Sequence, residues 1–332
     1  MFRTLMTTPE VLSYLLALCS QTLLCVLGTV LNIVCLFAFM TAFTHAYYRK
    51  TSLLIYLVAL SICNTLQLTL SVFVIILPAT EQFMDDQQYP YEYELLRSFN
   101  NRTLSITYPL LMSANYASIW ILTLICAQRY QSICHPSSPW KRRLSIFRNS
   151  NLCVGVAVIL SLVCNLPRYW ELHGIRDYLL YKIIQEGIIY GFVVYGAPMT
   201  LLIWLNYNTI RIVRHHDDIP LRPSAEHRTA LMTSSVFILF FLCTTLSASL
   251  RLIIIVTEHS LKHLDDIWLV DLSNLLMNAN AITMPVVCFI FTRGFRDLFF
   301  VIRYPATGAS CPRRFLSSSL RKKSSQFLQP LT

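Results

Sequence analysis

Charged side chains are scarce in this chain. Only 13% of its 332 residues are Asp, Glu, Lys or Arg, whereas 55% are hydrophobic. A soluble domain carries about 25% charged residues, because its surface has to be solvated. The shortage of charge excludes a soluble globular protein and predicts an integral membrane protein.

Polar interruptions are also few, and seven apolar stretches come close to the ~20 residues that a membrane-spanning helix needs. They cover residues 12–40, 52–77, 104–126, 152–166, 188–212, 231–256 and 267–291. None alternates between apolar and polar residues as a barrel strand does, and lipid offers backbone groups no hydrogen-bonding partner. The predicted fold is therefore all-α, a bundle of seven transmembrane helices.

The ends of the chain are polar. We predict a short extracellular N-terminus at residues 1–11, a transmembrane domain at 12–302 and a cytoplasmic tail at 303–332 that is disordered. Aromatic and basic residues at 293–300 predict a short amphipathic helix on the inner leaflet, with a disordered basic tail as the alternative. Cys311, beside two arginines, is a candidate for palmitoylation.

Basic residues set the predicted orientation. With the N-terminus outside, most of the 27 Lys and Arg fall on the cytoplasmic side, whereas the acidic residues gather outside. The net charge of +10 then reflects topology and contact with membrane lipid, and nucleic acid is not an expected partner. The sequon Asn101-Arg102-Thr103 lies on the outer side, which makes Asn101 a candidate for glycosylation.

Cysteine is missing from the predicted outer loops at residues 78–103, 167–187 and 257–266, so no disulfide can form between them. Spacings that would assemble a metal site or a catalytic nucleophile are missing as well. We expect no enzyme activity, no metal and no cofactor.

Apart from Arg211, at the predicted cytoplasmic end of 188–212, the charged residues inside the predicted spans are Arg251 and Asp271. Such residues are costly in lipid and usually functional. They could pair with each other, one could bind a charged ligand, or both could extend to the interface. The outer segment at 80–103 carries acids interleaved with tyrosines, which suits a cationic ligand, although a solvated loop has the same composition.

Several motifs occur in an order that resembles rhodopsin-class G-protein-coupled receptors. They are Gly28 to Asn32, Gln128-Arg129-Tyr130, Pro198, and Met284-Pro285-Val286-Val287-Cys288 followed by Phe295. Within that class, Asn165-Leu166-Pro167-Arg168-Tyr169-Trp170-Glu171 is similar to a run in invertebrate FMRFamide-type neuropeptide receptors. The resemblance covers residues 28 to about 300.

The resemblance implies a receptor at the plasma membrane that signals through a heterotrimeric G protein and binds arrestin. The residues it assigns to activation and coupling are Asn32, Asn64, Gln128, Arg129, Tyr130 and Pro285. Two of them depart from the family, which has an acid at the positions of Asn64 and Gln128. We therefore expect no sodium site like that of the family. At Gln128 we expect either raised basal activity or a rewired contact that holds the inactive state, and in both cases Gln128→Glu should change basal signalling.

The ligand class follows by exclusion within this resemblance. Residues 104–120 contain no acid to bind an amine, and residues 267–291 contain no lysine to form a Schiff base with retinal. A basic or amidated peptide remains, with Asp271 or Glu258 as its acidic partner and Arg251, Tyr108 and Asn115 as further candidate contacts. The alternative is a chemosensory receptor for a small odorant or pheromone; a channel or transporter lacks a polar path.

Overall fold

The structure is a computed structural model that describes residues 12–44, 52–86, 90–134, 138–173, 179–216, 225–257 and 267–291. Within these ranges all regular secondary structure is helical, which confirms the all-α class. Each range contains one of the seven predicted apolar stretches in helical form.

The first half of the chain contains η1 (Leu15–Ser20), α2 (Gln21–Thr44), α3 (Ser52–Ser71), η2 (Val72–Ile76), α4 (Leu77–Asp86), α5 (Pro90–Ile133), α6 (Pro139–Arg143) and η3 (Leu144–Arg148). The second half contains α7 (Ser150–Asn165), η4 (Leu166–His173), α8 (Leu179–Lys182), η6 (Ile183–Gly196), α9 (Ala197–His216), α10 (Ala225–Thr257) and α11 (Ile267–Phe291). The elements η1, η2 and η6 are π-helical, whereas η3 and η4 are 3-10 helices.

Among the described residues, five helical segments are long and apolar enough to cross a membrane. They are Leu12–Thr41, Ser52–Met84, Glu94–Ser132, Ser150–Tyr169 and Leu180–Ile212. A shorter apolar segment, Ser234–Leu250, lies within α10. Helix α11 has 25 residues and is not among these five segments. The sixth and seventh spans therefore stay predictions.

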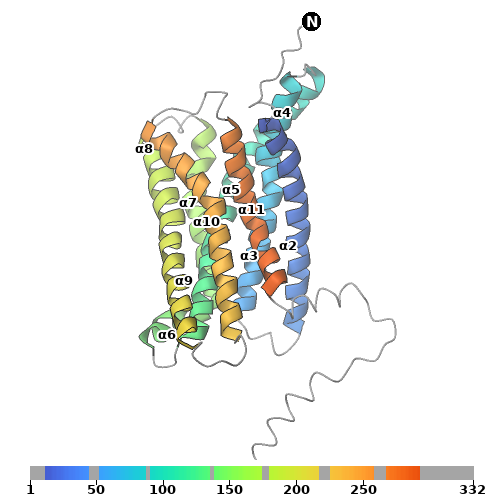
Figure 1. Cartoon of the computed structure of the whole chain (residues 1–332). Coiled ribbons are helices and arrows are strands. Elements are labelled where there is room, and N and C mark those ends of the chain that lie inside the picture. Colours follow the sequence, from blue (N-terminus) through green and yellow to red (C-terminus); the bar gives the residue numbers. More distant parts are fainter. Residues whose placement is uncertain are drawn as a thin grey trace, which may run out of the picture. The chain divides into compact units, whose positions relative to one another are not determined.

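Helix α5 lies at the centre of the bundle and contacts α3, α7, α9 and α10 (Figure 1). The most apolar window of its span is 83% buried, against 33% for the first span and 22% for the fourth. Large apolar side chains on those two outer helices, such as Leu23 and Ile159, are more than half exposed. Exposure of this kind is unfavourable in water and favourable in lipid.

Helices α2, α3 and α11 pack side by side, and a glycine permits their close approach. A Cβ atom on Gly28 would lie 2.7 Å from the Ile282 side chain of α11 and 2.8 Å from the Leu68 side chain of α3. A larger side chain fits at this position only if the Ile282 and Leu68 side chains shift. The first-span glycine of the family-like motif is therefore a packing residue.

The predicted outer loop at residues 80–103 is largely helical. Helix α3 continues through the π-helical turn η2 into α4, and α5 already begins at Pro90, with 87–89 outside the described residues. Proline suits the first turn of a helix, because the backbone N–H it lacks would have no partner there. The Asn100 amide of α5 donates a hydrogen bond of 2.7 Å to Glu81 of α4.

The predicted outer loop at residues 167–187 is also partly helical. It begins as η4, which continues directly from α7, and the fifth helical segment starts at Leu179 rather than at residue 188. Hydropathy marks where a helix crosses lipid, whereas these helices extend into polar sequence at their ends. The extension brings Arg168 against α5 and η6, where the clearest polar cluster of the bundle lies.

Candidate functional site

Arg168 is completely buried at the predicted outer end of the bundle. Its backbone belongs to η4, and the 3-10 geometry that follows α7 turns the side chain inward between α5 and η6. An unpaired arginine at such a place would lose its hydration without compensation. Arg168 must therefore be held by neighbouring acceptors.

Five side chains accept hydrogen bonds from the Arg168 guanidinium. Its Nε donates to Asn165 at 3.0 Å, one terminal nitrogen donates to Tyr108 at 2.6 Å and to Glu171 at 3.2 Å, and the other donates to Tyr116 at 3.2 Å and to Glu186 at 2.7 Å. The Tyr108 ring centroid lies 5.4 Å from the guanidinium carbon. We call these six residues the Arg168 cluster.

The Arg168 cluster joins three membrane-crossing segments of the chain. Tyr108 and Tyr116 come from α5, Asn165 and Glu171 from α7 and η4, and Glu186 from η6. Tyr181 adds a hydrogen bond of 3.1 Å to the Glu171 carboxylate. In a low-dielectric interior, charge-assisted bonds of this kind fix the relative position of the elements that carry them.

A short chain of contacts connects the Arg168 cluster to α10. The rings of Tyr116 and Tyr190 lie 6.0 Å apart between their centroids, and the Tyr190 hydroxyl donates to Ser247 of α10 at 3.1 Å. About one turn further along η6, Tyr195 shares a second hydrogen bond of 3.1 Å with Thr245 of α10. The segment that carries Glu186 is thus attached to α10 at two points.

The predicted ligand contacts fall in different places. Tyr108 belongs to the Arg168 cluster, whereas Asn115 lies two turns deeper in α5, where its amide is 3.5 Å from the Met277 sulfur. Asp271 accepts a hydrogen bond from Ser13 and is half-buried against the N-terminal helical segment. The side chain of Arg251 and the whole of Glu258 lie outside the described residues.

The predicted activation residues Asn32 and Asn64 meet at one backbone carbonyl. The amide of Asn32 donates to the Ala281 oxygen at 3.1 Å, and that of Asn64 donates to the same oxygen at 3.0 Å. In a helix this carbonyl would accept the N–H of the residue four positions later, which here is Pro285 and has none. Two side chains from α2 and α3 therefore replace the bond that Pro285 removes from α11.

A polar network continues along the same face of α11. Asn278 accepts hydrogen bonds from Gln67 at 3.0 Å and from Ser71 at 3.1 Å. Because these partners lie on α3, the network fixes the rotation of α11 against its neighbour.

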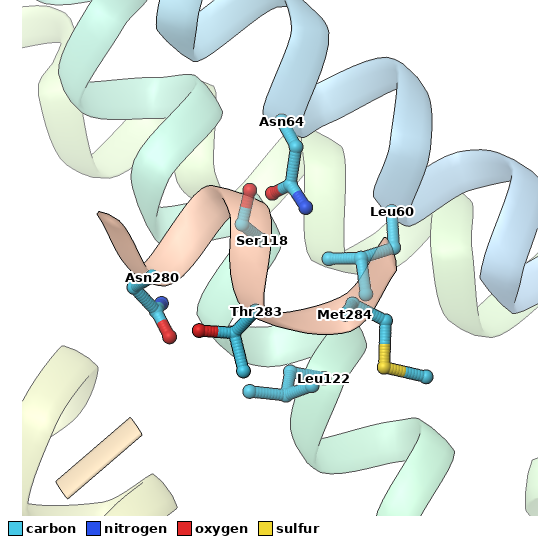
Figure 2. Close-up of a pocket in the computed structure, with 7 residues that line it drawn as sticks. All are labelled: Leu60, Asn64, Ser118, Leu122, Asn280, Thr283 and Met284. Atoms are coloured by element: carbon cyan, nitrogen blue, oxygen red, sulfur yellow. The ribbon is translucent and has the colours of Figure 1, made fainter. Parts of the chain in front are cut away.

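A cavity of about 10 Å³ lies where α3, α5 and α11 meet (Figure 2), lined by Leu60, Asn64, Ser118, Leu122, Asn280, Thr283 and Met284. That volume holds about one water molecule. The Asn280 side-chain oxygen is buried without a partner among the described residues. The lining carries amides and hydroxyls but no carboxylate, so its chemistry suits a water molecule better than an unpaired cation.

At the predicted cytoplasmic end, Gln128 and Arg129 are half-buried, and Tyr130 is buried. The Tyr130 ring lies 5.5 Å from Trp204 of α9, which also packs 4.8 Å from Trp140 of α6. The triplet is thus tied to the segment that follows α5.

The thiol of Cys134 lies just after α5. Burial raises the pKa of this thiol although Lys141 opposes the shift, so the thiol stays protonated at neutral pH.

The two predicted modification sites are Asn101 and Cys311. Asn101 is exposed on α5, and Cys311 lies outside the described residues. The central functional candidates that sequence reasoning missed are Tyr116, Arg168, Glu171 and Glu186. The family-like run from Asn165 to Glu171 was the available signal, but hydropathy assigned most of it to a loop.

No protein-family model matches the chain. It is 25% identical over 279 residues to the FMRFamide receptor of Drosophila melanogaster, covering 76% of this chain and 48% of that protein. It is 22% identical over 286 residues to the FMRFamide peptide receptor frpr-18 of Caenorhabditis elegans, covering 79% of this chain and 64% of that protein. The chain is similar to G-protein-coupled receptors.

A third relative extends the comparison to a vertebrate. The probable G-protein coupled receptor 142 of Mus musculus is 24% identical over 189 residues, covering 54% of this chain and 49% of that protein. The chain spans about half the length of two of these relatives and under two thirds of the third. All three are named as receptors. Receptors of this kind are membrane proteins, in agreement with the membrane-length helices of the chain, and are in general not enzymes.

Proposed function

We propose that this chain is a plasma-membrane receptor that binds an extracellular peptide and signals through a heterotrimeric G protein. The observation that carries the proposal is the similarity, over 76% and 79% of the chain, to two receptors named for FMRFamide peptides. The arrangement of polar groups supports it: the Arg168 cluster contacts the middle part of α5 at Tyr108 and Tyr116, and Gln128-Arg129-Tyr130 lies near the C-terminal end of the same helix.

A basic or amidated peptide is the proposed ligand. The helical pair α4 and α5 carries exposed or half-buried acids, such as Glu81 and Glu94, at the predicted outer side. Such a surface attracts a cationic ligand and raises its association rate. Tyr108, Asn115 and Asp271, together with Arg251 and Glu258, stay candidate contacts for its side chains.

Signalling requires two arrangements of the helices with different affinities for the ligand. We propose that the peptide favours an arrangement that opens the cytoplasmic end beside Arg129 and Tyr130 to the G protein, with arrestin as a second partner. Because the two sites are coupled through the same equilibrium, the G protein in turn raises peptide affinity.

The proposal is tested by expressing the chain in cells with a promiscuous G protein and screening a neuropeptide library. We expect a concentration-dependent response to one or more basic or amidated peptides. Mock-transfected cells and cells with Arg129→Ala at equal surface expression should not respond. Responses to small odorants in the absence of any peptide response would assign the chain to chemosensation, and a ligand-free ionic current would assign it to transport.

A further inference from the structure

Aromatic and basic side chains gather where α6 meets the predicted cytoplasmic end of α9 (Figure 1). The Trp140 ring of α6 packs 4.8 Å from the Trp204 ring of α9, and the guanidinium carbon of Arg143 lies 5.2 Å from the Trp140 ring centroid. Tyr207 and Arg211 follow Trp204 at helical spacing on α9. We call Trp140, Arg143, Trp204, Tyr207 and Arg211 the basic-aromatic surface.

Most of the basic-aromatic surface is open to its surroundings. Tyr207 has 64% of its surface exposed and Trp140 has 40%, and the side chains of Arg143 and Arg211 are exposed as well. Trp204 is half-buried between the two helices. The exposed side chains are therefore accessible to a molecule other than the described part of the chain.

The exposed face of α9 changes character along the helix. Ile203, Tyr207 and Arg211 are four residues apart, which places them on one face, and each is exposed. Helical rise separates them by about 6 Å each, so an apolar, an amphipathic and a charged side chain follow one another over about 12 Å. The same order of hydrocarbon, interface and headgroup occurs in a bilayer, where tyrosine and tryptophan concentrate at the interface and arginine extends to the headgroups. This face therefore places Arg211 at the level of the lipid phosphates.

The basic-aromatic surface is positively charged. No acid occurs between residues 130 and 170 or between 187 and 216, and the acids at 217–218 lie outside the described residues. Among the residues that the structure describes, neither Arg143 nor Arg211 forms an ion pair. Exposed guanidinium groups without acidic neighbours on their own elements attract an anion.

A phospholipid headgroup matches this surface in chemistry as well as in charge. A guanidinium binds phosphate oxygens through two N–H donors at once, and stacking on Trp140 restricts the Arg143 side chain before any lipid binds. Lys141 donates a hydrogen bond of 3.1 Å to the Cys134 carbonyl, which attaches α6 to the end of α5. An acidic protein surface would match the charge, but it would leave the apolar face around Ile203 without a partner.

We propose that the basic-aromatic surface is a binding site for the headgroup of an anionic phospholipid in the inner leaflet. Arg143 and Arg211 bind the headgroup oxygens, and Trp140 and Tyr207 pack against the glycerol and the upper acyl chain. The inference goes beyond the proposed function and does not depend on the identity of the extracellular ligand. Because the site includes both α6 and α9, bound lipid stabilises the contact between them.

The test uses the full-length chain, purified in a neutral detergent, and two lipids with equal chains, dioctanoyl-phosphatidylserine and dioctanoyl-phosphatidylcholine. Thermal unfolding is followed over a concentration series of each lipid, because a ligand that binds the folded state raises the unfolding midpoint. The double variant Arg143→Gln/Arg211→Gln removes the proposed contacts. Arg102→Gln/Lys182→Gln, at the predicted outer side, is the matched control with the same loss of charge.

We expect phosphatidylserine to stabilise wild type at concentrations roughly tenfold below those that phosphatidylcholine needs, since each basic side chain near an anionic lipid contributes about fivefold in affinity. Arg143→Gln/Arg211→Gln should lose most of this preference, whereas the control variant should keep it. Equal responses of wild type to the two lipids overturn the proposal. An unchanged preference in Arg143→Gln/Arg211→Gln overturns it as well.

Two further variants separate a built site from a general attraction to positive charge. Trp140→Leu keeps the net charge and removes the ring on which Arg143 lies, so it should weaken the preference by about threefold. Arg143→Lys/Arg211→Lys keeps the charge and should retain part of the preference, even if the glutamine variant is not recovered. A preference that Trp140→Leu leaves intact and that raised salt abolishes would show diffuse attraction only and contradict the site. Lost G-protein signalling with an unchanged lipid preference would assign the surface to a protein partner instead.

Discussion

At the scale of single residues, the completely buried Arg168 makes the largest set of polar contacts described in the bundle. Its guanidinium offers five N–H donors in a rigid fork, and the structure gives each side of that fork one tyrosine and one carboxylate. A lysine could not serve as many partners in this geometry. The residue is therefore specified by shape as well as by charge.

Arg168→Met tests this role, because it leaves the carboxylates of Glu171 and Glu186 without their shared partner. Removing one member of a buried ion pair costs about 3–5 kcal/mol, so surface expression and the unfolding midpoint should both fall. The triple variant with Glu171→Gln and Glu186→Gln removes the stranded charges and should recover part of the loss. Thermal unfolding of purified protein measures both effects, and an unaffected Arg168→Met would contradict the role assigned to the cluster.

Gly28 gives a second residue-scale prediction with a built-in control. A methyl group at this position meets Ile282 and Leu68 at 2.7–2.8 Å, whereas nothing lies within 4 Å of a Cβ atom on Gly155 of α7. Gly28→Ala should destabilise the protein by about 1–3 kcal/mol through overpacking. Gly155→Ala should be neutral or stabilising by up to about 1 kcal/mol, because alanine favours a helix. Equal effects in thermal unfolding would show that the three helices are not closely packed at Gly28.

At the scale of elements, the backbone carbonyl of Ala281 links α11 to α2 and α3. Pro285 has no N–H to donate to this carbonyl, so side chains of the two neighbouring helices bind it instead. The helix lacks one internal bond at Ala281, and the amides of Asn32 and Asn64 supply two replacements. A rotation of α11 would have to release both amides together. The proline thus converts an internal helix bond into a contact between three helices.

This arrangement predicts non-additive substitutions. Asn32→Ala or Asn64→Ala alone leaves one donor on the Ala281 carbonyl and should cost roughly 0.6 kcal/mol, the average for interhelical hydrogen bonds in membranes. The double variant leaves the Ala281 carbonyl without a donor and should cost about 1–3 kcal/mol more than the two single substitutions together. In a Pro285→Ala background the restored N–H should remove the excess. Urea or thermal unfolding of the variants measures the coupling, and strict additivity in both backgrounds would disprove the shared-acceptor role.

At the scale of the whole molecule, the distribution of charge predicts opposite locations for the two termini. Lys and Arg are concentrated in segments that lie on one side of the membrane if the chain crosses it seven times, and an N-terminus outside makes that side cytoplasmic. Five crossings would also separate the termini, but six or four would not. The parity of the spans is thus a property that one experiment can establish.

We expect an epitope tag at the N-terminus to bind antibody on intact cells and a tag at the C-terminus to bind only after permeabilisation. Fluorescence microscopy or flow cytometry of the two tagged proteins gives the comparison, with a cytosolic marker as the control for membrane integrity. Access to both tags on intact cells would exclude an odd number of spans and with it the proposed receptor topology.

Much of this molecule could be predicted from hydropathy, and its main polar cluster could not. The apolar stretches located all seven helical ranges, because lipid requires long continuous runs. The same criterion ended the fourth stretch at residue 166 and so placed Arg168 in water. Hydropathy does not reveal that Tyr108, Tyr116 and Glu186, which are distant in sequence, accept hydrogen bonds from the buried Arg168 guanidinium. Asn32, Asn64 and Pro285 were identified by resemblance, but their common carbonyl depends on helix packing.

The 44 residues of α5 correspond to about 66 Å of helix, roughly twice the thickness of the hydrocarbon core. Part of α5 therefore projects into water, paired with α4 through the bond between Asn100 and Glu81. The paired α4 and α5 form a folded, three-dimensional epitope, which faces outside in the predicted orientation. An antibody fragment raised against the native protein could distinguish folded molecules from denatured ones on living cells, which an antibody against a linear peptide from the same region could not do.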